Sequence, residues 1–233
     1  LTLRERLSVI GLGFIGYYLS SFLDFWGLQF ITASLERLIL YLNPTLVLVF
    51  GWIAYRKRIS PWHGAGMAVS YCGVLLVFGH EVSLQGSQTA LGALLVFASA
   101  VTYAIYLVYS GEFVKRMGSL RLVGLASTVA CLFCIAQYAL LRPIDSALSV
   151  PMPVIWLSVL NAVTCTVIPV LLVMMAIERI GPSATAQIGM VGPMSTIIMG
   201  VWLLGEPFTL WVLAGTALVL SGIYVFSRAG ASR

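Results

Sequence analysis

Apolar runs of about 20 residues follow one another along almost the whole chain, and no other feature constrains its fold as strongly. A helix of that length crosses the roughly 30 Å of hydrocarbon in a bilayer. Hydrophobic residues make up 60% of the 233 and charged residues only 9%, which is too little polar surface to cover a water-soluble domain of this size. The chain is therefore predicted to be a polytopic integral membrane protein.

The length of the runs also predicts their secondary structure. Inside a bilayer all backbone polar groups must be hydrogen-bonded within the protein, which leaves helices or closed barrels. The runs lack the alternation of a barrel strand, so an all-α membrane helical bundle is expected. Charged residues, Pro and Gly divide the chain into eight predicted spans: 7–30, 32–55, 61–79, 90–110, 120–141, 154–177, 184–204 and 210–227.

The basic residues predict an orientation for these spans. Lys and Arg are retained on the cytoplasmic side, and 11 of the 13 fall at the termini or in the loops after spans two, four and six. Of the opposite loops, only the one with Arg142 holds a basic residue. Both termini are therefore expected on the cytoplasmic side of the cell (inner) membrane, and the net charge of +5 reflects topology rather than a nucleic-acid partner.

The chain contains an internal repeat with an offset of 149 residues. This offset places Pro44 on Pro193 and yields nine further identities. These are Ile31/Ile180, Ser34/Ser183, Ile39/Ile188, Gly51/Gly200, Trp62/Trp211, Ala65/Ala214, Gly66/Gly215, Ala68/Ala217 and Gly73/Gly222. Spans one to three thus correspond to spans six to eight. Because this displacement of five spans is odd, the two units are predicted to have inverted topology, the arrangement of alternating-access transporters.

Segments of both halves resemble the EamA-type branch of the drug/metabolite transporter superfamily. The resemblance rests on residues 27–44, which run from Gly27 to Asn43-Pro44, and on Ile180-Gly-Pro-Ser through Gly192-Pro193 to Leu204-Gly-Glu-Pro207. It implies a small-molecule transporter, expected to be an exporter, with two units of five spans. One departure is Arg56-Lys57, which stands where the family has Gly-Glu after span two.

The resemblance also implies a domain organisation. Residues 1–79 correspond to the last three spans of the first EamA-like repeat, residues 90–227 to a complete second repeat, and residues 228–233 to a cytoplasmic tail. The first unit thus shows three spans instead of five. Because the sequence begins with Leu rather than Met, we expect that two leading spans are missing from it.

Apart from Arg121 at the very start of the fifth span, three charged residues lie inside the predicted spans, where a charge costs at least about 2.5–3.5 kcal/mol. Asp24 is expected about 10 Å deep on span one and Arg37 about 6 Å deep on span two, near enough for an ion pair. We interpret Asp24, Glu36 and Arg37 as a gate or a proton- or substrate-linked site. A permanent structural pair is the alternative, and Glu36 and Arg37 could also reach the outer interface.

Polar and aromatic residues inside the spans are candidates for a substrate cavity. Pro44 and Pro193 are expected to kink their helices and free carbonyl groups at matching positions of the two halves. The aromatic and hydroxyl groups suit an amphiphilic or cationic metabolite, although each residue could equally serve helix packing. The candidates are Tyr41, Asn43, Tyr103, Tyr106, Asn161, Gln187 and Ser195.

The sequence predicts no enzyme chemistry. It contains no phosphate-binding loop, no nucleophile–base pair and no metal-ligand spacing, so neither a metal nor another cofactor is expected. Expected partners are a small-molecule substrate and membrane lipid, while a coupling proton and a homodimer stay open. Two alternatives to a transporter remain: a truncated, non-transporting subunit or scaffold, and an intramembrane enzyme.

Overall fold

The computed structural model describes residues 3–56, 61–85, 87–143, 150–189, 199, 202–203 and 209–231. Within these ranges every regular element is a helix and no strand occurs, as the all-α prediction requires. Among the described residues, six helical stretches are long and apolar enough to cross a membrane. The chain is therefore a polytopic helical bundle, and its apolar spans identify it as an integral membrane protein.

The first span consists of three consecutive segments, because a π-helical stretch interrupts its α-helix. They are α1 (Leu3–Gly13), η1 (Phe14–Leu19) and α2 (Ser20–Gly27). The other described helices are α3 (Ala33–Leu40), α4 (Asn43–Tyr55), α5 (Pro61–Gln85), α6 (Ser87–Met117), α7 (Ser119–Leu141), α9 (Met152–Asn161), η2 (Ala162–Val167), α10 (Ile168–Ile180), α11 (Pro182–Ile188) and α13 (Leu210–Ala231).

Six of the eight predicted spans correspond to candidate membrane spans of the structure, with ends that differ by up to seven residues. The six are Glu5–Gly27, Ala33–Tyr55, Pro61–His80, Gln88–Met117, Ser119–Leu141 and Met152–Ile180. The prediction at 210–227 matches a shorter apolar helix, Leu210–Val225. Of the prediction at 184–204, the structure describes chiefly the beginning, in α11, so the number eight stays a prediction.

Two glycines end helices at the boundaries between spans. Gly118 and Gly181 have φ angles of 79° and 83°, a region that glycine adopts without strain. Their N–H groups donate to the carbonyls of Val114 and Ile177 at 2.8 and 2.9 Å, and these bonds satisfy carbonyls of the last helical turns. The chain can therefore reverse direction at both boundaries within a few residues.

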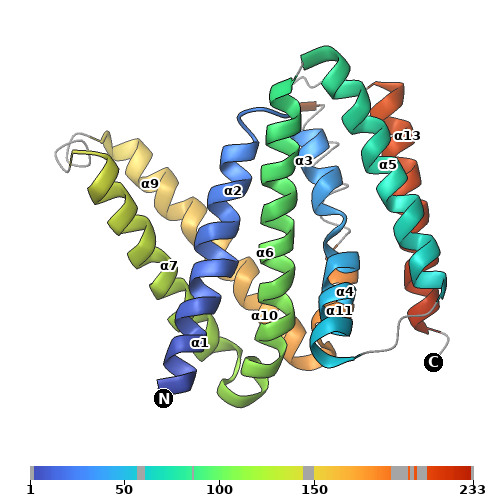
Figure 1. The fold of residues 1–233 in the computed structure, drawn as a ribbon. Helices are drawn as coiled ribbons and strands as arrows, with labels where there is room; N and C mark the ends of the chain where they lie inside the picture. Colours follow the sequence, from blue (N-terminus) through green and yellow to red (C-terminus); the bar gives the residue numbers. More distant parts are fainter. Residues whose placement is uncertain are drawn as a thin grey trace.

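The helices form a central group with a pair of helices on each side (Figure 1). α6 lies in the middle and contacts α2, α3, α4, α5 and α10. On one side α7 packs against α1 and α10. On the other side α5 and α13 pack along each other, in the most extensive contact between described elements. The spans far apart in sequence therefore meet around α6.

Two clusters of buried apolar side chains hold these groups together. One surrounds α6 and includes Val47, Leu107 and Met174, which come from three different spans. The other joins α3 to α5 and α13 and includes Leu35, Val77 and Val219. Both clusters contact the α3–α4 region, so this region is fixed from two sides.

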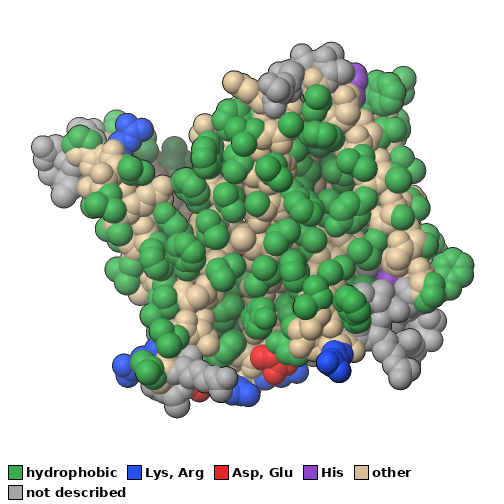
Figure 2. Space-filling model, in the orientation of Figure 1, with side chains coloured by type: hydrophobic (Ala, Val, Ile, Leu, Met, Phe, Trp, Pro, Cys, Tyr) green, Lys and Arg blue, Asp and Glu red, His purple; other side chains and the backbone are tan. Residues whose placement is uncertain are grey.

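The outer surface is apolar over most of its height. Figure 2 shows hydrophobic side chains across the middle of the visible face, whereas Lys, Arg, Asp and Glu gather mainly at the lower edge, near which both termini lie, and basic atoms also appear at the upper left. The span formed by α9, η2 and α10 is the least covered by other helices. A face of this composition is solvated by lipid chains rather than by water.

Candidate functional site

The second span is broken between α3 and α4, at Tyr41 and Leu42. Pro44 stands in the first turn of α4 and has no N–H group, so the carbonyl of Leu40 lacks the bond that residue 44 would otherwise donate. In the same turn, Thr45 Oγ1 donates a hydrogen bond of 2.6 Å to the carbonyl of Leu42. The sequence Asn43-Pro44 therefore opens the helix near the middle of the span.

A cavity of about 250 Å³ lies beside this break. Three further segments complete its wall, namely α6, α10 and the α11 region. The lining residues are Leu40, Tyr41, Asn43, Pro44, Tyr103, Leu107, Val173, Thr185, Ala186 and Gly189. The cavity thus lies between the broken second span and the beginning of the predicted seventh span.

Polar atoms of the cavity wall are buried without a partner. The Tyr41 side chain is 1% exposed, and its hydroxyl has no hydrogen-bond partner among the described residues. The same holds for the buried Oδ1 atom of Asn43. Thr185 is different, because its Oγ1 donates to the carbonyl of Gly181 at 2.8 Å. Unpaired polar groups in an apolar surrounding are costly, so a bound solute that pairs with them would be favoured.

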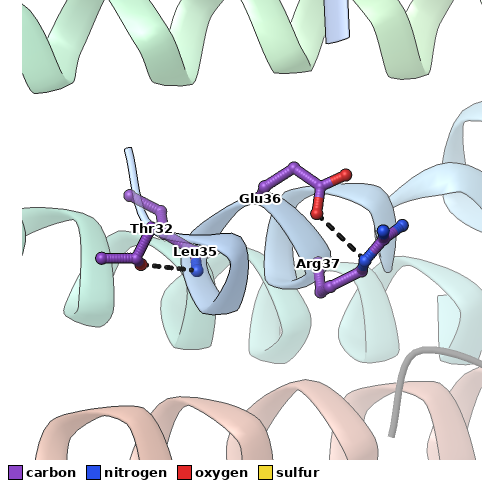
Figure 3. A network of polar contacts seen from close by, with 4 residues as sticks. All are labelled: Thr32, Leu35, Glu36 and Arg37. Atoms are coloured by element: carbon purple, nitrogen blue, oxygen red, sulfur yellow. Dashed lines mark hydrogen bonds and ion pairs between the residues drawn. The ribbon is translucent and has the colours of Figure 1, made fainter. Parts of the chain in front are cut away.

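The three intramembrane charges gather near the junction of α2 and α3. Glu36 is fully buried, and its Oε2 lies 3.0 Å from Nε of Arg37 (Figure 3). Thr32 holds the start of α3, because its Oγ1 accepts a hydrogen bond of 3.2 Å from the N–H of Leu35 (Figure 3). The carboxyl group of Asp24 on α2 lies close enough to interact with both Glu36 and Arg37. The cluster therefore links the first two spans.

The ion pair in this cluster differs from the predicted one. The sequence predicted a pair between Asp24 and Arg37, whereas the ion pair in the structure joins the neighbours Glu36 and Arg37. Asp24 takes part through its electrostatic interaction with Arg37. The prediction used the depth of each residue along its helix, which places all three residues near one another. Depth does not show in which direction a side chain points, and this direction decides which carboxylate reaches the guanidinium.

Tyr106 does not line the cavity, although it shares a helix face with Tyr103. Its side chain is 1% exposed, and its hydroxyl is hydrogen-bonded to that of Tyr17 in η1. The two rings lie with their centroids 4.9 Å apart. This pair fixes the first span against α6, so Tyr106 has a structural contact where the sequence predicted a cavity residue.

The remaining predicted residues lie elsewhere. Asn161, at the end of α9, is exposed on the surface of the described chain. Gln187 belongs to α11, and its side chain is outside the described part. Pro193 and Ser195 fall entirely outside the described residues. The structure thus brings Tyr41, Asn43, Pro44 and Tyr103 together at one cavity.

Several cavity residues were not singled out from the sequence, although they occupy repeat positions equivalent to those of predicted site residues. At the offset of 149, Val173, Thr185 and Ala186 correspond to Asp24, Glu36 and Arg37. The cavity wall in the second half therefore occupies the same repeat positions as the charged cluster in the first. Because two apolar residues and a threonine replace the charges there, their sequence gave no indication of a site.

Comparison with known proteins identifies a family. The sequence model of the EamA-like transporter family matches residues 1–79 and 90–228. "Uncharacterized transporter YcbK" of Bacillus subtilis (strain 168) is 34% identical over 209 residues. This alignment covers 84% of the chain but 64% of that relative, so the chain spans less than two thirds of its length.

A second relative and a solved structure extend the comparison. "Probable amino-acid metabolite efflux pump" of Salmonella typhimurium (strain LT2) is 24% identical, over 83% of this chain and 67% of that protein. A crystal structure, described only as that of a protein, matches with a TM-score of 0.67 and 23% identity, over 97% of this chain and 79% of that one. The structural match shows the fold alone, while the relatives' names are those of transporters rather than enzymes.

Proposed function

The chain belongs to the EamA-like transporter family, and from this premise we propose that it is a secondary transporter that moves a small metabolite by alternating access. The cavity beside Tyr41 carries this proposal. It lies between the break of the second span and α11, and two of its lining residues, Leu40 and Gly189, are equivalent at the repeat offset of 149. A site between equivalent segments of two inverted halves can face either side of the membrane in turn.

The secondary structure supports the proposed repeat. The first span carries the π-helical segment Phe14–Leu19, and the sixth span carries another at Ala162–Val167. At the repeat offset the first segment corresponds to residues 163–168, so the two differ in position by one residue. π-Helical turns are rare in helices and are frequent at functional sites.

Charge supports the proposed orientation, with both termini in the cytoplasm and the protein in the cell membrane. Basic residues follow the even-numbered spans, and charged side chains gather at the edge near the termini (Figure 2). Lys and Arg are retained on the cytoplasmic side during insertion. Eight spans fit this alternation of charge.

We assign the cluster of Asp24, Glu36 and Arg37 to an outer gate. In the proposed orientation these residues lie near the outer ends of spans one and two, whereas Thr185 and Ala186 lie near the inner end of span seven. The charged cluster and the cavity wall are equivalent in the repeat but lie at opposite depths. Closure on the outside by the interactions of Asp24 on α2 with Glu36 and Arg37 on α3, together with an open wall inside, would describe an inward-facing state.

The same cluster is the candidate for proton coupling. It contains two carboxyl groups and one guanidinium, so its formal charge is −1 when all three are ionised. A charge buried in an apolar surrounding is costly, and one proton on either carboxyl group removes the excess. Release of Arg37 during gate opening would change that balance, which would couple the proton to access.

The direction we propose is export. The family resemblance points to it, and the name of the Salmonella relative describes efflux. A test places the purified chain in liposomes loaded with a mixed metabolite pool and measures counterflow of labelled metabolites. Exchange of at least one solute supports the transporter. Accumulation of a new product without exchange would favour an enzyme instead.

One observation favours a second candidate, a non-transporting subunit or scaffold. The span formed by α9, η2 and α10 is the least buried of the six candidate membrane spans, and the chain spans 64% of the Bacillus relative. A surface of this kind is suited to further helices. Liposomes that contain the chain but exchange no solute, together with a chain that co-purifies with another membrane protein, would support this second candidate.

A further inference from the structure

The cavity offers hydrogen-bond acceptors at one place, the break between α3 and α4. Leu40 lines the cavity, and Pro44 has no N–H group that could donate a hydrogen bond to the Leu40 carbonyl. A carbonyl oxygen can only accept hydrogen bonds. Next to it along the chain are the hydroxyl of Tyr41 and the Oδ1 atom of Asn43, both buried and without partners among the described residues. The carbonyl oxygen and Oδ1 only accept, and the Tyr41 hydroxyl can accept as well as donate, so a ligand that brings several N–H donors can satisfy all three oxygens, whereas a ligand with acceptors alone can pair only with the hydroxyl.

The rest of the wall favours a positive ligand over a negative one. None of the described lining residues carries a charge, so a bound anion would meet no cation. Two of the lining residues, Tyr41 and Tyr103, have aromatic rings. The face of such a ring attracts ammonium groups, and this attraction grows when water is excluded.

The charged cluster of Asp24, Glu36 and Arg37 acts in the same direction when all three groups are ionised. The N–H of Tyr41 donates to the carbonyl of Arg37 at 3.0 Å, so the charged cluster is one helical turn from the cavity residue. Arg37 is already paired with Glu36, and Asp24 adds a second carboxyl group. With all three groups ionised the cluster is negative, and its field is weakly screened in an apolar surrounding.

We propose that the cavity beside Tyr41 selects small solutes that carry a protonated amine on an apolar body. The ammonium group donates to Tyr41, Asn43 and the Leu40 carbonyl, while the apolar body contacts Leu107, Val173 and Ala186. A volume of about 250 Å³ equals that of about eight water molecules and thus fits a solute of about eight non-hydrogen atoms. The proposal rests on the transport function and names the substrate class of the same site.

Three compounds of nearly equal size separate the alternatives, namely benzylamine, benzyl alcohol and benzoate. Their binding to the purified full chain is measured at pH 7 by equilibrium dialysis with labelled ligand. We expect benzylamine to bind most tightly, benzyl alcohol less tightly and benzoate least. Binding of benzyl alcohol or benzoate as tight as that of benzylamine would overturn the proposal.

Two variants test the residues that hold the amine. Tyr41→Phe and Asn43→Leu each remove one acceptor, and each is expected to weaken benzylamine binding roughly tenfold or more. Tyr109→Phe makes the same change as Tyr41→Phe on the exposed face of α6 and should bind like the original chain. Equal benzylamine binding by all three variants contradicts the proposed contacts. The order of the three compounds on the unchanged chain does not depend on whether a variant folds.

Counterflow distinguishes this proposal from the transport function itself. If proteoliposomes exchange members of a metabolite pool but benzylamine neither binds nor competes, the substrate class is wrong and the transport function stands. If no solute exchanges while benzylamine binds in the expected order, the chain has the proposed binding site and the transport function is wrong.

Discussion

Ser70 Oγ donates a hydrogen bond of 3.3 Å to the carbonyl oxygen of Val219, the residue 149 positions further along the chain. This separation equals the offset of the repeat, so a residue meets its own equivalent where α5 packs against α13. Two equivalent residues meet where a pseudo-two-fold axis passes between them. The contact therefore supports the inverted-repeat proposal independently of the charge pattern.

The glycines around this contact are arranged in the same reciprocal way, and they yield the first prediction. A Cβ atom on Gly73 would lie 2.7 Å from the carbonyl oxygen of Gly215, and one on Gly222 would lie 2.5 Å from that of Gly66. We expect Gly73→Ala to destabilise the chain by about 1–3 kcal/mol, because the two backbones must separate. Thermal unfolding in detergent measures this loss.

Gly79 provides the control for that substitution. It also lies on α5, but an added Cβ atom would have no neighbour within 4 Å. Gly79→Ala should therefore leave the melting temperature unchanged or raise it slightly, because alanine is the better helix former. If both substitutions had the same effect, close packing of α5 and α13 would not explain the result at Gly73.

The second prediction concerns the ion pair of Glu36 and Arg37. Arg37→Met removes the cation beside a fully buried carboxyl group. The expected loss of stability is about 3 kcal/mol, near the lower end for broken buried pairs because the Arg37 side chain is 35% exposed. The double variant Glu36→Met/Arg37→Met leaves neither partner of the pair and should regain part of that loss, while Asp24 still loses its interactions with both residues. Thermal unfolding measures the stability of the single and double variants. No recovery in the double variant would contradict the explanation that the loss comes from an unpaired buried carboxyl group.

The third prediction separates proton coupling from a structural role of Asp24. Asp24→Asn keeps the size of the side chain but removes its titration. If the cluster carries the coupled proton, uptake into proteoliposomes should lose its pH dependence, whereas counterflow at equal pH on both sides should persist. Glu112→Gln, at an exposed position near the end of α6, is the matched control and should keep the original pH profile. An unchanged pH profile in Asp24→Asn would exclude a proton role for this residue.

The fourth prediction concerns the tyrosine pair that joins the first span to α6. Tyr17→Phe and Tyr106→Phe each remove one hydroxyl from a pair in which Tyr106 is buried. Each single variant should lose about 1–3 kcal/mol of stability, and the double variant should lose less than the sum of both. A double-mutant cycle by thermal unfolding measures this coupling. Additive losses would show that the hydroxyl groups contribute separately.

The sequence predicts the membrane helices well because lipid requires each of them to be an apolar run of about 20 residues. The ends of the spans at Tyr55, Pro61 and Leu141 agree with the structure, since charge, Pro and Gly mark where hydrocarbon ends. The π-helical segments were not predicted, because an extra residue in a turn leaves an apolar run apolar. A π-helical segment changes the course of the helix but not the amino-acid composition of the span.

The candidate site was predictable in part, for a different reason. The proline of Asn43-Pro44 indicates a break in the helix whatever the neighbouring spans are. Tyr41 lies beside this break and lines the cavity. Helical spacing placed Tyr103 and Tyr106 on one face, but it does not say which neighbour each one meets. Tyr103 meets the cavity and Tyr106 meets Tyr17. Tertiary contacts of this kind are decided by the arrangement of spans, which no single helix encodes.

The last prediction concerns Pro44, which opens the second span at the cavity. Pro44→Ala supplies the missing N–H group, so the carbonyl of Leu40 can be satisfied and α3 can continue into α4. Stability should rise only modestly, by less than the roughly 3 kcal/mol that a proline costs in a helix interior, because Pro44 stands in the first turn of α4, where proline is tolerated. Transport should fall, because a continuous helix removes the acceptors at the break and narrows the cavity. Thermal unfolding and counterflow are measured on the same preparation. A variant that transports as before would show that the break has no part in transport, whereas unchanged or higher stability with lower transport would assign the break at Pro44 to the substrate site.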